Sequence, residues 1–149
     1  MKSKSILLLP LVAIIAVLGC NRTPKGEFGD FETFYNRFMK DSLYQMDHIM
    51  FPLEGMPDNA DSSAIANGFH WDEDNWVIHH KFDPAESGFH SEFIPLGDGV
   101  IQEKIIHRSG EYGMLRRFAK LSDEWYLIYY AGLNPLRKED VQIQSGFSQ

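Results

Sequence analysis

Four apolar-rich runs in the C-terminal half restrict the possible folds of this chain more than any other feature. They cover residues 89–96, 100–108, 112–121 and 124–132. The gaps between them are two or three residues long and consist mostly of Gly, Ser and Asp. Strand-like runs joined by such short gaps are typical of β-hairpins. The sequence therefore predicts an antiparallel meander of four strands.

A helix with an aromatic stripe is predicted upstream of the meander. Four aromatic residues recur at the i, i+3, i+4, i+7 spacing of one helical face. They are Phe31, Phe34, Tyr35 and Phe38. Asp30 precedes them as a suitable N-cap. Ser42 and Gln45 have the spacing of a capping box, which predicts a second, short helix beginning near Ser42.

The stretch between these helices and the meander is less regular. We expect an extended piece over 49–53, where Pro52 restricts it to a sheet edge or a bend, and a loop over 57–66. Residues 72–82 fit either a strand or a helix, and the capping and dipole pattern favours a short helix that ends before Pro84. Helices followed by a meander predict an α+β fold in which the N-terminal helices pack on the sheet.

The N-terminus has the layout of a secretory signal. Lys2 and Lys4 precede an apolar stretch of thirteen residues, Ile6 to Leu18, and small Gly19 follows. A helix that crosses a bilayer needs about 20 apolar residues. The stretch is therefore predicted to direct export and not to span the membrane.

The motif "VLGC", residues 17–20, resembles the lipobox of bacterial lipoproteins. The resemblance implies cleavage between Gly19 and Cys20 and lipidation of the Cys20 sulfur, with acyl chains such as palmitate. The alternatives are a free thiol left by an ordinary signal and an uncleaved, buried cysteine. Lipidation is favoured because an unpaired cysteine in an exported protein otherwise needs a partner. Two or three acyl chains hold a protein on a membrane, at about 0.8 kcal/mol per buried CH₂.

Asn21 follows the cysteine, where many inner-membrane lipoproteins carry Asp. The resemblance thus implies anchoring in the outer membrane, with the domain facing the periplasm. The predicted organisation is a signal peptide over 1–19, lipidated Cys20 with a flexible spacer over 20–29, an α+β domain over 30–134, and a C-terminal tail over 135–149.

The net charge excludes one class of partner. It is −7 for the whole chain and −9 once residues 1–19 are removed, because they hold two basic and no acidic residues. An acidic surface repels phosphate backbones, so no nucleic-acid partner is expected.

Several motifs carry a resemblance to a known family. They are "FYNRFM" (34–39), "FPLEG" (51–55), the pair Trp71 and Trp76, and "YGMLRRFAKLSDEWYLIYY" (112–130). With them the domain resembles small lipoproteins of unknown function from Bacteroidetes-type bacteria, whose fold is similar to nuclear transport factor 2. The resemblance implies a cone in which a curved sheet wraps around the helices, and it implies no activity.

Polar residues within the meander are the candidates for a ligand-binding pocket. Because the faces of a strand alternate, one of Arg116 and Arg117 points inward, and Glu103 and His107 share a face of the preceding run. The candidate pocket lining is Arg116, Arg117, Glu103, His107, Trp125, Tyr129 and Tyr130. The alternative is that the Arg and Glu form a structural ion pair and that the aromatic residues belong to the core.

No catalytic, cofactor-binding or metal-binding motif is found. No two of the six histidines have the spacing of a helical metal pair, and no nucleophile elbow is present. We therefore expect a non-catalytic envelope module that binds a small molecule or an envelope protein. The alternatives are a small enzyme that uses Glu103 and His107 as an acid–base pair, and a module that binds a protein partner through an exposed aromatic patch.

Overall fold

The computed structural model describes residues 29–136. The predicted signal peptide, Cys20 and all but two residues of the predicted tail lie outside this range. In chain order the elements are α1 (Gly29–Phe38), α2 (Ser42–Asp47), β1 (Ile49–Met56), α3 (Ser62–Asn67), β2 (Phe69–Trp71), the 3₁₀ turn η1 (Glu73–Asn75), α4 (Pro84–Ser87), β3 (Phe89–Gly97), β4 (Val100–His107), β5 (Tyr112–Leu121) and β6 (Glu124–Pro135).

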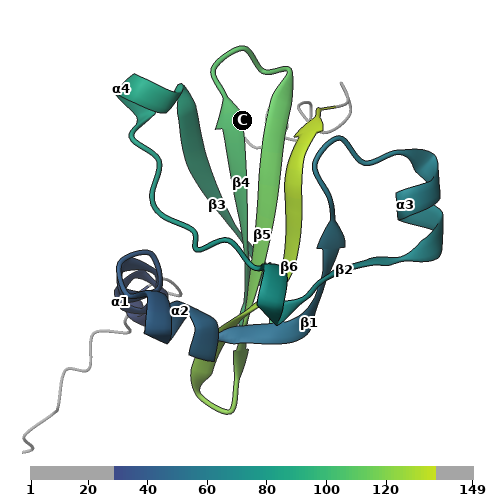
Figure 1. Ribbon diagram of the computed structural model, residues 1–149. Coiled ribbons are helices and arrows are strands. Elements are labelled where there is room, and N and C mark those ends of the chain that lie inside the picture. The colour runs from purple at the N-terminus through teal and green to yellow at the C-terminus, as the bar shows by residue number, and fades with distance from the viewer. Residues whose placement is uncertain (1–28, 137–149) are drawn as a thin grey trace, which may run out of the picture.

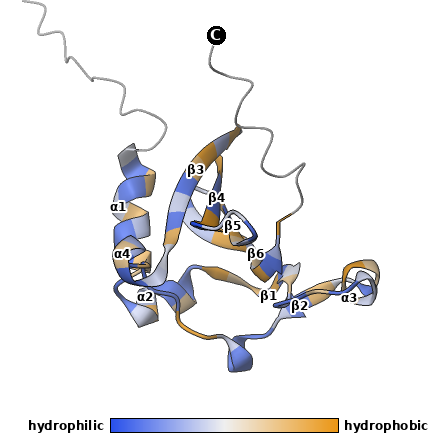
Figure 2. Cartoon of the chain, turned by 90° about the horizontal axis from the view of Figure 1, so that it is seen from above, coloured by the Kyte–Doolittle hydropathy of each residue, from blue (hydrophilic) through white to orange (hydrophobic). Residues whose placement is uncertain are grey.

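A six-stranded mixed sheet with the strand order β2-β1-β6-β5-β4-β3 forms the centre of the molecule (Figure 1). Strands β3 to β6 pair as consecutive antiparallel hairpins, which confirms the predicted meander. Strand β1 adds to β6 in parallel, and β2 adds to β1 in antiparallel orientation. The predicted α+β class is confirmed, with α1 and α2 on one side of a curved sheet (Figure 2).

Helix α1 forms as its aromatic stripe predicts. All four aromatic residues of the stripe are buried against the sheet. Phe31 meets Phe118 of β5 and Trp125 of β6 at centroid distances of 5.4 and 5.0 Å, and Phe38 is completely buried. Burying one such side chain contributes about 1.5–3 kcal/mol. The core therefore lies between α1 and the sheet.

Strand β1 is not an edge strand, because it pairs on both sides. The predicted bend is present: the Phe51–Pro52 peptide bond is cis, and the register with β6 shifts between Ile49 and Glu54. After the bend, Gly55 passes close to β6. A Cβ atom at Gly55 would lie 1.9 Å from the carbonyl oxygen of Tyr130, so only glycine fits.

The predicted capping box of α2 is wrong in its residues. The N-cap is Asp41, whose side chain accepts a hydrogen bond from the Tyr44 amide. Gln45 instead points into the core, where its Nε2 donates to the carbonyl oxygens of Phe38 and His79 at 2.8 and 2.9 Å. Gln45 therefore joins α2 to a distant loop and does not cap its own helix.

The loop predicted over 57–66 contains the start of α3. The Asp61 side chain accepts from the amides of Ser63 and Ala64 and begins this helix, none of whose residues is buried. A helix formed by capping alone has no apolar periodicity, which is why the sequence pattern missed it. It stands at the outer end of β1 and β2, away from α1 (Figure 1).

The short helix favoured over 72–82 is wrong. Only the turn η1 forms, and Trp76 to Asp83 have no regular secondary structure. The His79 amide donates to Gln45 Oε1 at 2.7 Å, which takes the place of a bond within a helix. The expected contact between Trp71 and Trp76 exists without the helix, at a centroid distance of 6.2 Å.

The core and all six strands come from residues 29–136. A chain that begins at Asn21 therefore contains all the described strands and the whole of this core. Within residues 29–136, no helix has the length and apolar character needed to cross a membrane.

Candidate functional site

Strands β4 and β5 separate the polar residues of the meander into two groups. The register pairs Glu103 with Arg116 and, one position along, Gln102 with Arg117. Because neighbouring residues of a strand point to opposite faces, the first pair faces α1 and the second pair faces away from it. The two faces offer different chemistry.

On the face toward α1, Glu103 and Arg116 form a buried ion pair. Their side chains are 0% and 2% exposed, and Arg116 Nη1 donates to Glu103 Oε2 at 3.1 Å. The other carboxylate oxygen, Oε1, accepts from the hydroxyls of Tyr35 and Ser91, both at 2.6 Å. Both oxygens of Glu103 are thus hydrogen-bonded, as a buried carboxylate requires.

His79 completes this buried network. Arg116 Nε donates to His79 Nδ1 at 3.1 Å, so the neutral ring accepts on Nδ1 and carries its proton on Nε2. Burial, followed by the nearby charge of Arg116, lowers the pKa of His79 to about 2. Burial and the charge of Glu103 raise the pKa of Tyr35. Both shifts favour the neutral forms of His79 and Tyr35, and the ion pair between Glu103 and Arg116 is closed to solvent.

Two further predicted site residues belong to the core on this face. Trp125 packs edge-on against Phe31, and Tyr130 packs against His79 at a centroid distance of 4.5 Å. Trp125 is 6% exposed and Tyr130 is 9% exposed. Four of the seven predicted residues, Glu103, Arg116, Trp125 and Tyr130, therefore lie on the helix side of the sheet.

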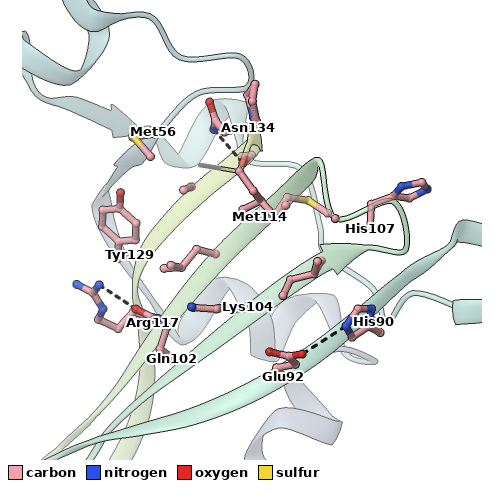
Figure 3. A pocket seen from close by; sticks show the side chains of 18 of the residues that line it. Met56, His90, Glu92, Gln102, Lys104, His107, Met114, Arg117, Tyr129 and Asn134 are labelled. Carbon is pink, nitrogen blue, oxygen red and sulfur yellow. Dashed lines mark hydrogen bonds and ion pairs between the residues drawn. The ribbon is translucent and has the colours of Figure 1, made fainter. Parts of the chain in front are cut away.

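The opposite face of the sheet holds a groove with a volume of about 530 Å³ (Figure 3). Strands β3 to β6, the end of β1 and Leu136 border it. Its apolar lining consists chiefly of Met56, Ile106, Met114, Leu115, Ala131 and Leu136. The predicted residues Arg117, Tyr129 and His107 also line this groove.

Arg117 is held at one end of the groove by two neighbouring side chains. Its Nη2 donates to Gln102 Oε1 at 3.1 Å, and its guanidinium lies 5.2 Å from the ring centroid of Tyr129 (Figure 3). Its Nε–H is buried and has no hydrogen-bond acceptor among residues 29–136. Within residues 29–136, no carboxylate forms an ion pair with Arg117. Burial raises the pKa of the Tyr129 hydroxyl, which keeps it a neutral donor.

The acidic residue of the groove, Glu92, has a lysine and an imidazole as neighbours. Glu92 lies opposite Lys104 in the register of β3 and β4. Its Oε1 is 3.5 Å from His90 Nε2. The charge of Glu92 is therefore offset locally. Among the described residues no carboxylate is paired with Arg117, and Glu54 lies in the same row of the sheet on the other side of Tyr129.

His107 lies at the end of β4 and does not meet Glu103. Its ring packs against Phe89 at a centroid distance of 5.1 Å, and its Nδ1 is 3.0 Å from Ser109 Oγ. Within the described chain no hydrogen bond joins it to the Glu103 carboxylate, which is fully buried four residues away. The structure does not bring these two together as an acid–base pair.

Sequence reasoning missed several residues of both faces. Gln45 and His79 are joined across 34 positions of the chain, and no local pattern indicates such a contact. Gln102 could have been predicted, because the short hairpin gaps fix a register that places it beside Arg117. In the part of the chain that is described, no three His, Cys, Asp or Glu side chains gather where they could hold a metal ion.

No family model matches the sequence, and neither does any curated protein. Solved structures do match. An NTF2-like protein from Bacteroides fragilis is 14% identical with a TM-score of 0.46, and the match covers 68% of this chain but only 45% of that one. A cystatin-like protein from Bacteroides caccae is 17% identical with a TM-score of 0.48, over 68% and 74% of the two chains. An NTF2-like protein of unknown function from Pseudomonas putida is 10% identical with a TM-score of 0.33, over 76% and 89%.

Two of these three neighbours are named NTF2-like, the fold name that the sequence resemblance implied, and the third is named cystatin-like. At such identities they say nothing about activity, ligand or partner.

Proposed function

We propose that the protein is a lipid-anchored module of the bacterial envelope that binds a small molecule without transforming it, in the groove on the outer face of the sheet. The groove itself carries the proposal. Its volume of about 530 Å³ lies within the range of about 300–1,000 Å³ found for small-molecule sites. Its mostly apolar lining with a few placed polar groups is the composition of such sites.

The non-catalytic part of the proposal is supported by the distribution of polar groups. At one end of the groove, Arg117, Gln102 and Tyr129 supply hydrogen-bond donors and an amide, and none of these three side chains is a nucleophile paired with a base. The carboxylate that acid–base chemistry would use, Glu103, lies on the other face and is fully buried. A ligand in the groove therefore meets groups that bind and orient it.

The envelope location is supported by the sequence alone. The export signal and the lipobox-like motif that ends at Cys20 favour a lipid anchor. Asn21, the residue after the motif, favours the outer membrane, with the domain in the periplasm. The eight residues between Cys20 and α1 are a predicted spacer that keeps the domain away from the lipid.

Native mass spectrometry tests ligand binding directly. The chain from Asn21 to Gln149 is exported by a bacterial host, incubated with a small-molecule and lipid extract of bacterial envelopes, and purified without detergent, which would itself fill an apolar groove. The variant Leu115→Trp fills the floor of the groove. Leu96→Trp, at a 50% exposed residue of β3 outside the groove, is the matched control.

We expect the wild type and Leu96→Trp to carry a bound small molecule that Leu115→Trp has lost. An apo mass for the wild type after incubation, or equal retention by Leu115→Trp, would overturn the proposal.

A further inference from the structure

We propose that the ligand of the groove is an amphipathic carboxylate, whose carboxylate binds the guanidinium of Arg117 and whose apolar chain lies along the floor toward Leu136. The inference rests on the proposed function and adds the chemical class of the ligand. It is carried by the charge at one end of the groove and the apolar surface that extends from it.

The anion end is built around Arg117. A guanidinium has five N–H donors in a planar fork. Within residues 29–136, Arg117 uses one hydrogen bond, from Nη2 to Gln102, and one ring contact, with Tyr129. These two neighbours fix the plane of the guanidinium and leave donors for an external acceptor. A planar carboxylate matches that fork with two parallel hydrogen bonds.

The comparison with Arg116 shows what Arg117 lacks. Arg116, the adjacent residue, has a carboxylate partner in Glu103 and an imidazole acceptor in His79. Arg117 has neither, although its Nε–H is buried. A half-buried cation without a counter-charge is stabilised by an anionic ligand, because the local dielectric is lower than that of water.

The surroundings of Arg117 favour an anion over a cation. Glu92 is the one acidic residue that lines the described groove, and it faces Lys104 and His90. Arg108 adds a positive charge at the opposite end of the groove, beyond the paired residues Ile106 and Gly113. The groove is thus locally cationic on a chain whose net charge is −7, which gives charge complementarity to an anion there.

The apolar path begins next to Arg117. On β5, Leu115 follows on the same face and pairs with Ala131 of β6. Gly113 comes next, and a Cβ there would lie 3.0 Å from Leu136 Cδ2, so Leu136 packs directly on the strand. Four residues of strand span about 13 Å. An extended chain of about ten methylenes, with C–C bonds of about 1.5 Å, fits this length.

Isothermal titration calorimetry with three probes tests the class of ligand. The probes are dodecanoate, 1-dodecanol and dodecyltrimethylammonium, the two charged probes below their micelle concentrations and dodecanol below its solubility limit. The protein is the chain from Asn21. We expect dodecanoate to bind about tenfold or more tightly than dodecanol, as a charge-assisted hydrogen bond implies. The cationic probe is expected to bind more weakly than either.

The variant Arg117→Gln should bind dodecanoate no better than the wild type binds dodecanol. Arg117→Lys keeps the charge but not the fork, and it should recover part of the lost affinity. Arg37→Gln is the matched control, because Arg37 is exposed on α1 outside the groove, and it should leave the affinity unchanged. Circular dichroism checks that each variant is folded.

Equal affinities for dodecanoate and dodecanol, or an unchanged affinity in Arg117→Gln, would overturn the inference. So would the absence of binding by all three probes. In each of these cases the proposed function still stands if native mass spectrometry finds a ligand that Leu115→Trp loses. Both fail together only if that ligand is absent too.

Discussion

Arg116 and Arg117 are neighbours in the sequence, yet they have opposite roles because the strand turns them to opposite faces. In the core, Arg116 donates hydrogen bonds to Glu103, His79 and Met39. Arg117 contacts an amide and an aromatic ring at the edge of a groove. One arginine therefore stabilises the fold, and the other is available to a ligand.

The two arginines should differ in their effect on stability. Arg116→Met leaves the Glu103 carboxylate buried without its counter-charge, and we expect a loss of about 3 kcal/mol or more in the free energy of unfolding. Arg117→Met, matched in size and charge change, should cost less than about 1 kcal/mol. Urea unfolding followed by circular dichroism measures both. Similar losses would contradict the assignment of the two faces.

His79 should make the protein sensitive to acid. In the unfolded chain His79 takes up a proton near pH 6.5, whereas in the folded protein its pKa is about 2. Between these values the unfolded state binds the extra proton. The free energy of unfolding therefore falls as the pH decreases below about 6.5, by at most about 1.4 kcal/mol per pH unit.

The variant His79→Asn keeps an acceptor for Arg116 but has no titratable ring. Its urea midpoint should depend less on pH between 6.5 and 3 than that of the wild type. His80→Asn, at the exposed neighbouring position, controls for the loss of an imidazole. Parallel pH profiles for wild type and His79→Asn would show that His79 contributes nothing to the acid sensitivity.

At the scale of elements, the close approach of β1 to β6 should be the least tolerant point of the sheet. Gly55→Ala places a Cβ against the Tyr130 backbone, which cannot move aside as a side chain can. We expect a loss of about 2 kcal/mol or more, or failure to fold. Glu54→Ala, at the exposed adjacent residue, should cost less than about 1 kcal/mol. Thermal unfolding of both variants measures the difference.

Elements with a repeating pattern could be predicted from the sequence, and elements held by single contacts could not. The stripe on α1 and the four runs of the meander predicted their own structure, since periodicity reports burial directly. Helix α3 depends on one Asp61 cap. The loop of His79 depends on Gln45, a contact between residues 34 positions apart.

The same distinction applies to the candidate site. The sequence identified Arg116, Arg117 and Glu103 as notable and required the two arginines to face opposite sides. It did not show which one faces the helices, because this depends on how the whole sheet is placed against α1. The apolar floor of the groove was missed because Ile106 and Leu115 read equally well as core residues.

At the scale of the whole molecule, the domain has its core on one face of the sheet and a groove on the other. The sequence predicts that a spacer joins this domain to a lipid anchor. Residues 1–28 lie outside the described part of the chain, so the anchor stays a prediction from sequence. It is testable separately from ligand binding.

Labelling cells with an alkyne analogue of palmitate tests the anchor. The full chain should be labelled and should fractionate with the outer membrane, whereas Cys20→Ala should carry no label. Asn21→Asp should keep the label and move toward the inner membrane. Labelling of Cys20→Ala at the wild-type level would contradict the assignment of Cys20 as the lipidated residue.

The most direct test of the division between a structural face and a binding face follows the arginine Nε–H signals by NMR while dodecanoate is added to the chain from Asn21. The Nε–H of Arg116 donates to His79, and that of Arg117 has no acceptor in the described part of the chain. The account predicts that the Arg117 signal shifts in a saturable manner and that the Arg116 signal stays in place. A shift of the Arg116 signal alone, or of neither, would contradict it.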